Sequence, residues 1–308
     1  MFFPKRKVIM VVWLCSFLPS TSCAMSSAKD LTGCLVYADR GKNIRKIDLK
    51  TLRHEVLYEG PGNVTSIDHF SKTGPDKFLF EECNGLRTPN CLLMEFDLTN
   101  RTVSILRSGR MPTYIAERDS VFFYDRIKDD GEQWLLVARR GAMDAATEVA
   151  KAPGVITFPN GLGFFPGGPV VQVSTDEVVF VGEDWRLMIY DMANGQVRST
   201  GLNHKSPRIW RSQTQQLIAR DWETKAFYQI NLKKGDVKKL PQLGRRVHSG
   251  LGYLPEYDTL IYSMPRFSFI YWHETSDIFA YHYKTEKKVK LLPHGSISSG
   301  IWWSCSDL

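Results

Sequence analysis

The stretch Leu35–Gly60, LVYADRGKNIRKIDLKTLRHEVLYEG, predicts three short β-strands that are separated from one another by polar turns. Apolar and β-branched residues make up each short run, and turn-forming residues such as those of Asp48–Thr51 follow it. The same pattern recurs along the whole chain. Because self-similarity at a fixed period indicates a repeat architecture, the spacing of the repeats is the first property to establish.

The repeats follow one another at a regular spacing. The central residues of the third strand in each unit are Asp48, Asp97, Ala138, Asp191, Asn231 and His282, whose residue numbers differ by 49, 41, 53, 40 and 51. This spacing fits four strands and their loops per unit, as in the blades of a β-propeller. Several of these strands end in an Asp or Asn that can accept hydrogen bonds from the following turn, which predicts an outer hairpin in each blade.

The two ends of the chain determine the number of blades. The first unit begins at its second strand, near Cys34, whereas the chain finishes with an inner strand at Ser296–Ser304. Together they make one blade, and this closure removes strand edges that would otherwise pair with other chains. Residues 25–308 are therefore expected to form an all-β, six-bladed β-propeller. A C-terminal inner strand completes its N-terminal blade and closes the ring.

The N-terminal segment has the three parts of a secretory signal peptide. Basic residues at Lys5–Lys7 precede an apolar run at Val8–Leu18 and small residues at Ser20–Ala24. Eleven positions are too few for a spanning helix, which needs about 20. We expect residues 1–24 to be cleaved and the mature chain to be periplasmic or secreted. The alternative is a lipoprotein acylated at Cys23, the only case in which a membrane is an expected partner.

The charge and composition of the chain argue against nucleic-acid binding and for one large folded domain. Loss of residues 1–24 removes three basic side chains and lowers the formal net charge from +7 to +4. No run of Lys and Arg typical of nucleic-acid binders follows, so nucleic acid is not an expected partner. The apolar fraction of 43% is sufficient for the core of one large domain.

Four cysteines remain after the signal segment: Cys34, Cys83, Cys91 and Cys305. An even number in an exported chain favours disulfides, with three connectivities for four cysteines. Ring closure places Cys34 beside Cys305, which predicts the pairs Cys34–Cys305 and Cys83–Cys91. The alternative at Cys83 and Cys91 is a metal site, which needs more ligands than these two residues supply. No metal and no cofactor are expected.

Two further stretches resemble degenerate forms of the TolB-type propeller repeat. They are Trp210–Ala219, WRSQTQQLIA, and Tyr253–Tyr262, YLPEYDTLIY, and each leads into a third strand. The first blade's Leu35–Asp39, LVYAD, is similar to the YWTD type. This resemblance implies a six-bladed propeller exported from a bacterial cell that often acts as a binding or scaffolding module. It implies no catalytic residues.

Candidate ligand-binding residues are expected at one mouth of the ring, where the loops between second and third strands meet the loops that enter the inner strands. The first set of loops contributes carboxylates and indoles, which suit a cation, a basic peptide or a sugar. Arg and Trp of the second set suit an anionic or planar ligand. An aromatic loop at Pro265–Asp277 is a further candidate contact. The candidates are Asp184, Trp185, Asp221, Trp222, Tyr114, Arg208, Trp210, His248, Phe269 and Trp272.

Each candidate has a structural alternative. Asp residues at strand ends also tie turns, and His or Arg can be buried and hydrogen-bonded along the channel wall. The Gly-x-Ser-x-Gly elbow and the HExxH motif are missing from the sequence. The leading hypothesis is therefore an exported binding or scaffold module for an envelope or extracellular protein or glycan. The alternative is a metal-dependent, lactonase-like propeller hydrolase that acts on a small ester or sugar.

Overall fold

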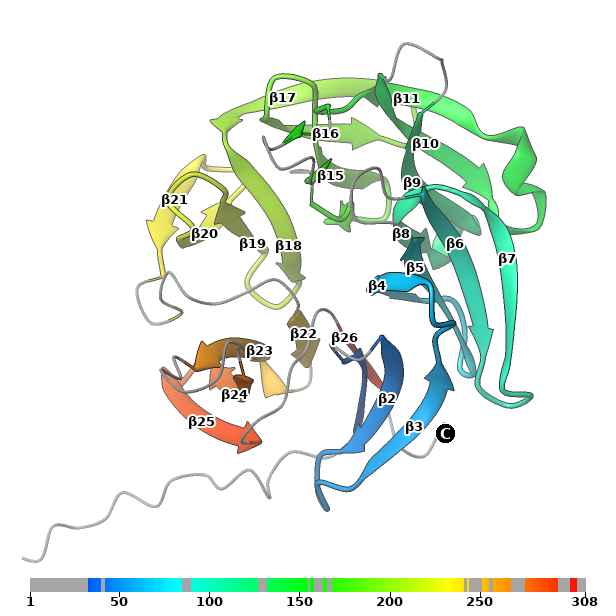
Figure 1. The fold of residues 1–308 in the computed structure, drawn as a ribbon. Coiled ribbons are helices and arrows are strands. Elements are labelled where there is room, and N and C mark those ends of the chain that lie inside the picture. Colours follow the sequence, from blue (N-terminus) through cyan, green and yellow to red (C-terminus); the bar gives the residue numbers. More distant parts are fainter. Residues whose placement is uncertain are drawn as a thin grey trace, which may run out of the picture.

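The computed structural model shows a ring of antiparallel sheets around a common axis (Figure 1). In the part of the chain that it describes, there are six four-stranded sheets and one two-stranded hairpin. The prediction of an all-β, six-bladed propeller is thus confirmed. The described residues are 33–303 without 40–41, 85–89, 127–131, 155, 158–162, 165–167, 241–242, 244–250, 255–256, 267–274 and 293–299.

Each blade runs from an inner strand at the axis to an outer strand at the rim (Figure 1). Blade 1 contains β26 (Gly300–Trp303), β1 (Cys34–Ala38), β2 (Asn43–Asp48) and β3 (His54–Glu59). Blade 2 contains β4 (Val64–Lys72), β5 (Lys77–Asn84), β6 (Asn90–Asp97) and β7 (Thr102–Ser108). Blade 3 contains β8 (Arg110–Ile115), β9 (Ser120–Arg126), β10 (Gln133–Arg139) and β11 (Thr147–Lys151), with short 3-10 turns at Ala116–Arg118 and Arg140–Ala145.

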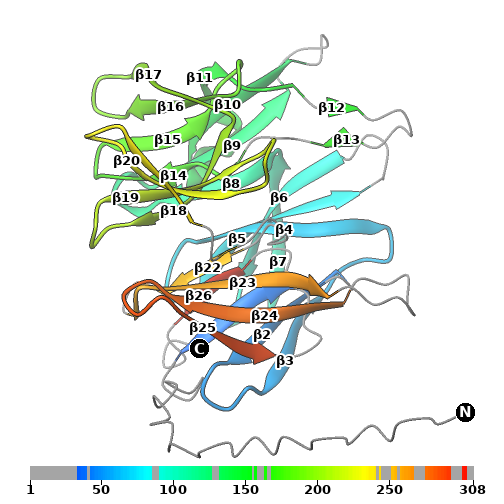
Figure 2. The same ribbon diagram turned by 90° about the vertical axis from the view of Figure 1, so that its left-hand side faces the viewer.

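The second half of the ring repeats this plan. Blade 4 contains β14 (Val171–Gln172), β15 (Glu177–Val181), β16 (Arg186–Asp191) and β17 (Gln196–Asn203). Blade 5 contains β18 (Lys205–Arg211), β19 (Gln216–Asp221), β20 (Phe227–Asn231) and β21 (Asp236–Lys239). Blade 6 contains β22 (Leu251–Leu254), β23 (Thr259–Arg266), β24 (Thr275–His282) and β25 (Lys287–Leu292). The hairpin of β12 (Ile156–Thr157) and β13 (Gly163–Phe164) lies apart from the blades (Figure 2).

The two ends of the described chain share one sheet. Its strand order is β26-β1-β2-β3, and β26 is antiparallel to β1, with Cys34 opposite Trp303 and Tyr37 opposite Gly300. No helix among the described residues is long and apolar enough to cross a membrane.

The hydrophobic core lies between neighbouring blades. Successive strand residues point to opposite faces of a sheet, and each blade packs on both faces, so the middle strands are apolar almost throughout. In β5 every residue from Phe78 to Cys83 is buried. Between blades 1 and 2, for example, the ring of Tyr58 on β3 packs against the ring of Phe80 on β5, with centroids 6.0 Å apart. These interfaces hold the blades at fixed positions around the axis.

The outer hairpins use the predicted turn chemistry. Asp48 Oδ1 accepts hydrogen bonds from the backbone N–H groups of Lys50 (2.9 Å) and Thr51 (2.8 Å). Asp191 accepts one from Ala193 N–H at 2.8 Å, and Asn231 accepts one from Lys233 N–H at 3.1 Å. A short polar side chain therefore satisfies the backbone of each turn, as the repeat pattern predicts.

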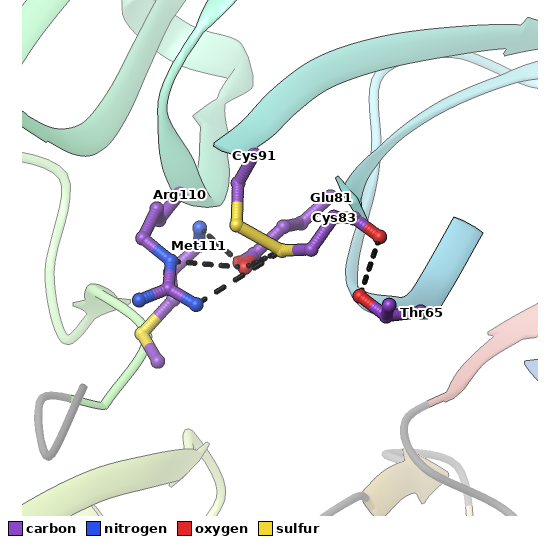
Figure 3. Close-up of a disulfide and its surroundings, with 6 residues drawn as sticks. All are labelled: Thr65, Glu81, Cys83, Cys91, Arg110 and Met111. Atoms are coloured by element: carbon purple, nitrogen blue, oxygen red, sulfur yellow. Dashed lines mark hydrogen bonds and ion pairs between the residues drawn. A yellow bond between two sulfur atoms is a disulfide. The ribbon is translucent and has the colours of Figure 1, made fainter. Parts of the chain in front are cut away.

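The predicted disulfide between Cys83 and Cys91 is present, with an S–S distance of 2.09 Å (Figure 3). The two residues lie directly opposite each other on β5 and β6. Cys34 is also disulfide-bonded. Its predicted partner, Cys305, lies outside the described residues, so the pair Cys34–Cys305 stays a prediction.

Candidate functional site

The loops between second and third strands of blades 4 and 5 lie at the end of the ring where β18 begins. In blade 5, Lys205 at the start of β18 is opposite Asp221, and the loop to β20 follows directly. The equivalent loop of blade 4 connects β15 to β16 and contains Trp185. We call this end of the ring the mouth, and it is where the sequence predicts a site.

Trp185 and Trp222 stack on each other across the boundary between blades 4 and 5. Their ring centroids are 4.7 Å apart and their planes differ by 15°. Both side chains are half-buried, so part of each indole is accessible to a partner. We call these two residues the tryptophan pair. The structure therefore brings together two predicted site residues that are 37 positions apart in the sequence.

His204 fixes the tryptophan pair from the loop between the two blades. Its backbone N–H donates to Trp185 O at 2.8 Å, and its carbonyl accepts from Trp222 N–H at 3.1 Å. The indole Nε1–H of Trp222 donates to His204 Nδ1 at 3.1 Å, which requires an unprotonated Nδ1. Trp185 and His204 both have left-handed backbone, with φ of 61° and 55°. Bulky side chains rarely adopt this conformation, and such residues gather at functional sites.

A shallow depression lies beside the tryptophan pair. It is lined by Val181, Trp185, His204, Lys205, Ser206 and Trp222. Exposed charged side chains border the pair on both loops, namely Glu183, Asp184, Glu223 and Lys225. Lys225 lies over the Trp222 ring, with Nζ 5.2 Å from its centroid. The mouth thus combines accessible aromatic surface with charges of both signs.

The two predicted acids at the mouth have different roles. Asp221 is 5% exposed, forms an ion pair with Lys205 at 2.5 Å and accepts the Thr224 backbone N–H at 2.7 Å. Burial alone raises the pKa of Asp221, but the hydrogen bonds from Lys205 and Thr224 outweigh it and hold the pKa below its ordinary value. Asp221 is therefore structural. Asp184 is exposed, 3.6 Å from Arg186, and is accessible to a partner.

Tyr114 and Trp210 are not at the mouth, so their predicted placement is wrong. They lie at the opposite ends of their inner strands, where Tyr114 is opposite Val121 and Trp210 is opposite Leu217, each beside the turn to the second strand. Trp210 packs against the core between blades 4 and 5. The physical reason is that β8 and β18 begin two or three residues earlier than the sequence predicts. Residues expected at the strand entries are therefore at the exits.

Arg208 lies in the middle of β18, where Pro207 is opposite Ala219 and Ile209 is opposite Ile218. Arg208 is therefore the extra residue of a β-bulge, which changes the direction of its side chain. The other three candidates, His248, Phe269 and Trp272, lie outside the described residues. Lys205 is a further residue of the mouth that the sequence does not indicate, because its contact with Asp221 depends on a strand register that the sequence alone does not show.

One group among the described residues has the spacing of a metal site. Glu81, Cys83 and Cys91 place their ligand atoms within 4.8 Å of one another, but a disulfide joins the two sulfurs (Figure 3). Glu81 already accepts hydrogen bonds from Arg110 Nε at 3.2 Å and from the backbone N–H of Met111 at 2.8 Å. With the disulfide formed, this group offers a metal ion one occupied carboxylate, which is too few ligands.

The chain resembles known proteins in its fold and not in its sequence. No family model and no curated protein matches the sequence. Among solved structures, TolB from Acinetobacter baumannii has a TM-score of 0.64 at 12% identity, covering 88% of this chain and 66% of the TolB chain. The chain therefore spans about two thirds of the length of TolB.

Two other solved structures are similar. An oligogalacturonate lyase, solved in complex with manganese, has a TM-score of 0.50 at 16% identity, covering 75% of this chain and 70% of the lyase chain. A chain of a nidogen/laminin complex has a TM-score of 0.49 at 12% identity, covering 68% of this chain and 76% of the other. The resemblance to TolB-type six-bladed propellers is confirmed for the fold.

Proposed function

Starting from a six-bladed propeller of the TolB type, we propose that this chain is an exported binding or scaffold module. Its mouth engages an envelope or extracellular protein or glycan. The observation that carries the proposal is the tryptophan pair, because Trp is enriched among the residues that dominate binding energy at interfaces. His204 holds the indole of Trp222 by a hydrogen bond, and Trp185 stacks on that indole, so little conformational entropy is lost on contact.

Two features of the chain support export. Residues 1–24 have the pattern of a signal peptide, and disulfides such as Cys83–Cys91 persist in oxidising compartments outside the cytosol. The alternative function, a metal-dependent hydrolase, has no supporting ligand cluster among the described residues. The binding module is therefore the function that the geometry supports best.

Closure of the ring is also part of the proposal. We propose that the pairing of β26 with β1 joins the two ends of the propeller and keeps the mouth loops in register. Support comes from the four-residue antiparallel register between Cys34–Tyr37 and Gly300–Trp303. Closure of this kind leaves no blade edge open to other chains.

The test is partner capture by the purified mature protein with point variants. Trp222→Ala and Trp185→Ala should each reduce capture of a specific protein from envelope extracts, or binding to a specific glycan on an array. Ile105→Ala is the matched control, because Ile105 is 64% exposed on the outer strand β7, away from the mouth. Melting temperatures verify that each variant is folded. Capture that is the same for the parent and both tryptophan variants contradicts the proposal.

A further inference from the structure

Arg208, on the inner strand β18 of blade 5, is a half-buried cation with an unused donor. The pKa of Arg208 is lowered to about 10 by burial and by the nearby Arg220, and Asp68 partly opposes this shift. Asp68 lies on β4 of blade 2, directly across a ring of six blades from β18 (Figure 1). β18 and β4 are both inner strands of their blades, so Arg208 and Asp68 both lie on strands that face the axis of the ring.

Arg208 belongs to a series of cations that leads from the mouth to the axis. Arg220, near the end of β19, lies close enough to both Arg208 and Lys225 to lower their pKa values. Lys225 in turn lies over Trp222 of the tryptophan pair. The series Lys225, Arg220 and Arg208 therefore begins beside the accessible indoles and ends inside the ring.

Each of the two guanidinium groups has an Nε donor that no described residue uses. The Nε atoms of both Arg208 and Arg220 are buried and make no hydrogen bond to any residue that the structure describes. Arg220 lies over the ring of Phe227, 5.8 Å from its centroid, a cation–π contact that attracts the guanidinium without using its N–H donors. Asp68 attracts Arg208. Two neighbouring, half-buried positive charges with unused donors favour an anion that pairs with them.

We propose that Arg208 and Arg220 form a binding site for an oxyanion, a carboxylate or a phosphate group, inside the channel behind the tryptophan pair. The guanidinium group suits this ligand, because its planar fork of N–H donors matches two oxygens of one group. The buried hydroxyl of Ser206, opposite Arg220 in the sheet and without a hydrogen bond to a described residue, offers another donor on the same strands. This site does not depend on the proposed partner of the mouth.

Anion binding to the full mature protein tests the site. Calorimetry and thermal unfolding with inorganic phosphate, and separately with acetate, are run at constant ionic strength set with sodium chloride. Arg208→Met and Arg220→Met should each weaken the preferred anion by about tenfold or more, since a hydrogen bond to a charged group is lost. Arg198→Met is the matched control, because Arg198 is exposed on β17 and pairs with Glu177. It should bind as the parent does.

The two anions separate the possible sources of the ligand. Preference for phosphate indicates a phosphate ester, and preference for acetate indicates a carboxylate on a peptide or sugar. Equal anion binding by the parent and both Arg variants, or no binding of either anion by the parent, overturns the proposal.

A second readout does not need the ligand. Without added anion, Arg208→Met removes one of two like charges and should melt at the same temperature as the parent or higher. A clearly lower melting temperature assigns Arg208 a structural pairing with Asp68 instead and also overturns the proposal. If Arg208→Met does not fold, Arg208→Lys keeps the positive charge but lacks the planar guanidinium group, and it should still weaken anion binding.

Discussion

The substitution Asp258→Asn tests whether the ion pair between Arg211 and Asp258 stabilises the boundary between blades 5 and 6. Arg211, the last residue of β18, donates from Nε to Asp258 Oδ1 at 2.9 Å and from Nη2 to Oδ2 at 2.6 Å. The hydroxyl of Tyr253 donates to the same carboxylate at 2.7 Å, and the guanidinium lies 3.9 Å from the centroid of the Tyr283 ring. The substitution keeps the size of the side chain and removes its charge.

The expected loss follows from burial of the pair. The side chains of Arg211 and Asp258 are 6% and 15% exposed, so the variant leaves a buried guanidinium without its counter-charge. Loss of one partner of a buried ion pair costs about 3–5 kcal/mol, and we expect about 3 kcal/mol because Asp258 is partly open to water. For a chain of this size that corresponds to a melting temperature lower by roughly 5–10 °C.

The effect should depend on pH in one direction. Burial alone raises the pKa of Asp258, but the hydrogen bonds from Arg211 and Tyr253 outweigh it and hold the pKa below its ordinary value. The stabilisation is therefore fully present above the unfolded pKa of about 3.9 and is lost as the pH falls through the folded pKa. Denaturant unfolding at pH 7 should show the full difference between variant and parent, and the difference should shrink below about pH 4.

Two controls complete the design. Arg211→Met with Asp258→Leu removes both charges and should cost clearly less than the sum of the two single variants. Glu177→Gln breaks the exposed pair with Arg198 and should cost less than about 1 kcal/mol. A cost below 1 kcal/mol for Asp258→Asn at pH 7 would refute the argument that this pair fixes the boundary between the two blades.

Two other predictions concern the backbone and the chain ends. Gly109→Ala should destabilise the protein by roughly 1–3 kcal/mol, because φ is 149° and a Cβ would lie 2.9 Å from Phe123 Cδ2 and 3.0 Å from Leu93 Cδ1. Gly154→Ala, which meets no atom within 4 Å, should melt near the parent, and equal melting of both variants contradicts this account. Cys34→Ser should lower stability by roughly 4–5 kcal/mol under oxidising conditions and little under reducing ones, measured by thermal unfolding. A variant that melts with the parent in both buffers contradicts the proposed long-range bond.

Local chemistry made most of the fold predictable. The turns after Asp48, Asp191 and Asn231 rest on contacts within four residues, which a sequence shows directly. The number of blades followed from the repeat spacing together with the incomplete units at the two ends of the chain. Strand boundaries were less certain, because the start of a strand depends on pairing with its neighbour. A shift of two or three residues at β8 and β18 moved Tyr114 and Trp210 from one end of the ring to the other.

The site was only partly predictable. The similar sequences at Glu183–Trp185 and Asp221–Glu223 suggested equivalent loops, but the stacking of their indoles depends on how neighbouring blades pack. The sequence also could not show that Asp221 and Asp184 have different roles. Asp221 forms an ion pair with Lys205 and accepts hydrogen bonds in a turn, whereas Asp184 is exposed. Arg208 is the extra residue of a bulge, and an extra residue in one strand has no signature in a single sequence.

The position of Arg208 has a consequence for communication within the ring. Blades pack against their neighbours, so a change in one blade ordinarily passes around the circumference from interface to interface. Arg208 and Asp68 instead lie on the inner strands of blades 5 and 2, which share no hydrophobic cluster among the described residues. An anion held by Arg208 at the axis would therefore lie near blades that do not pack against one another along the circumference.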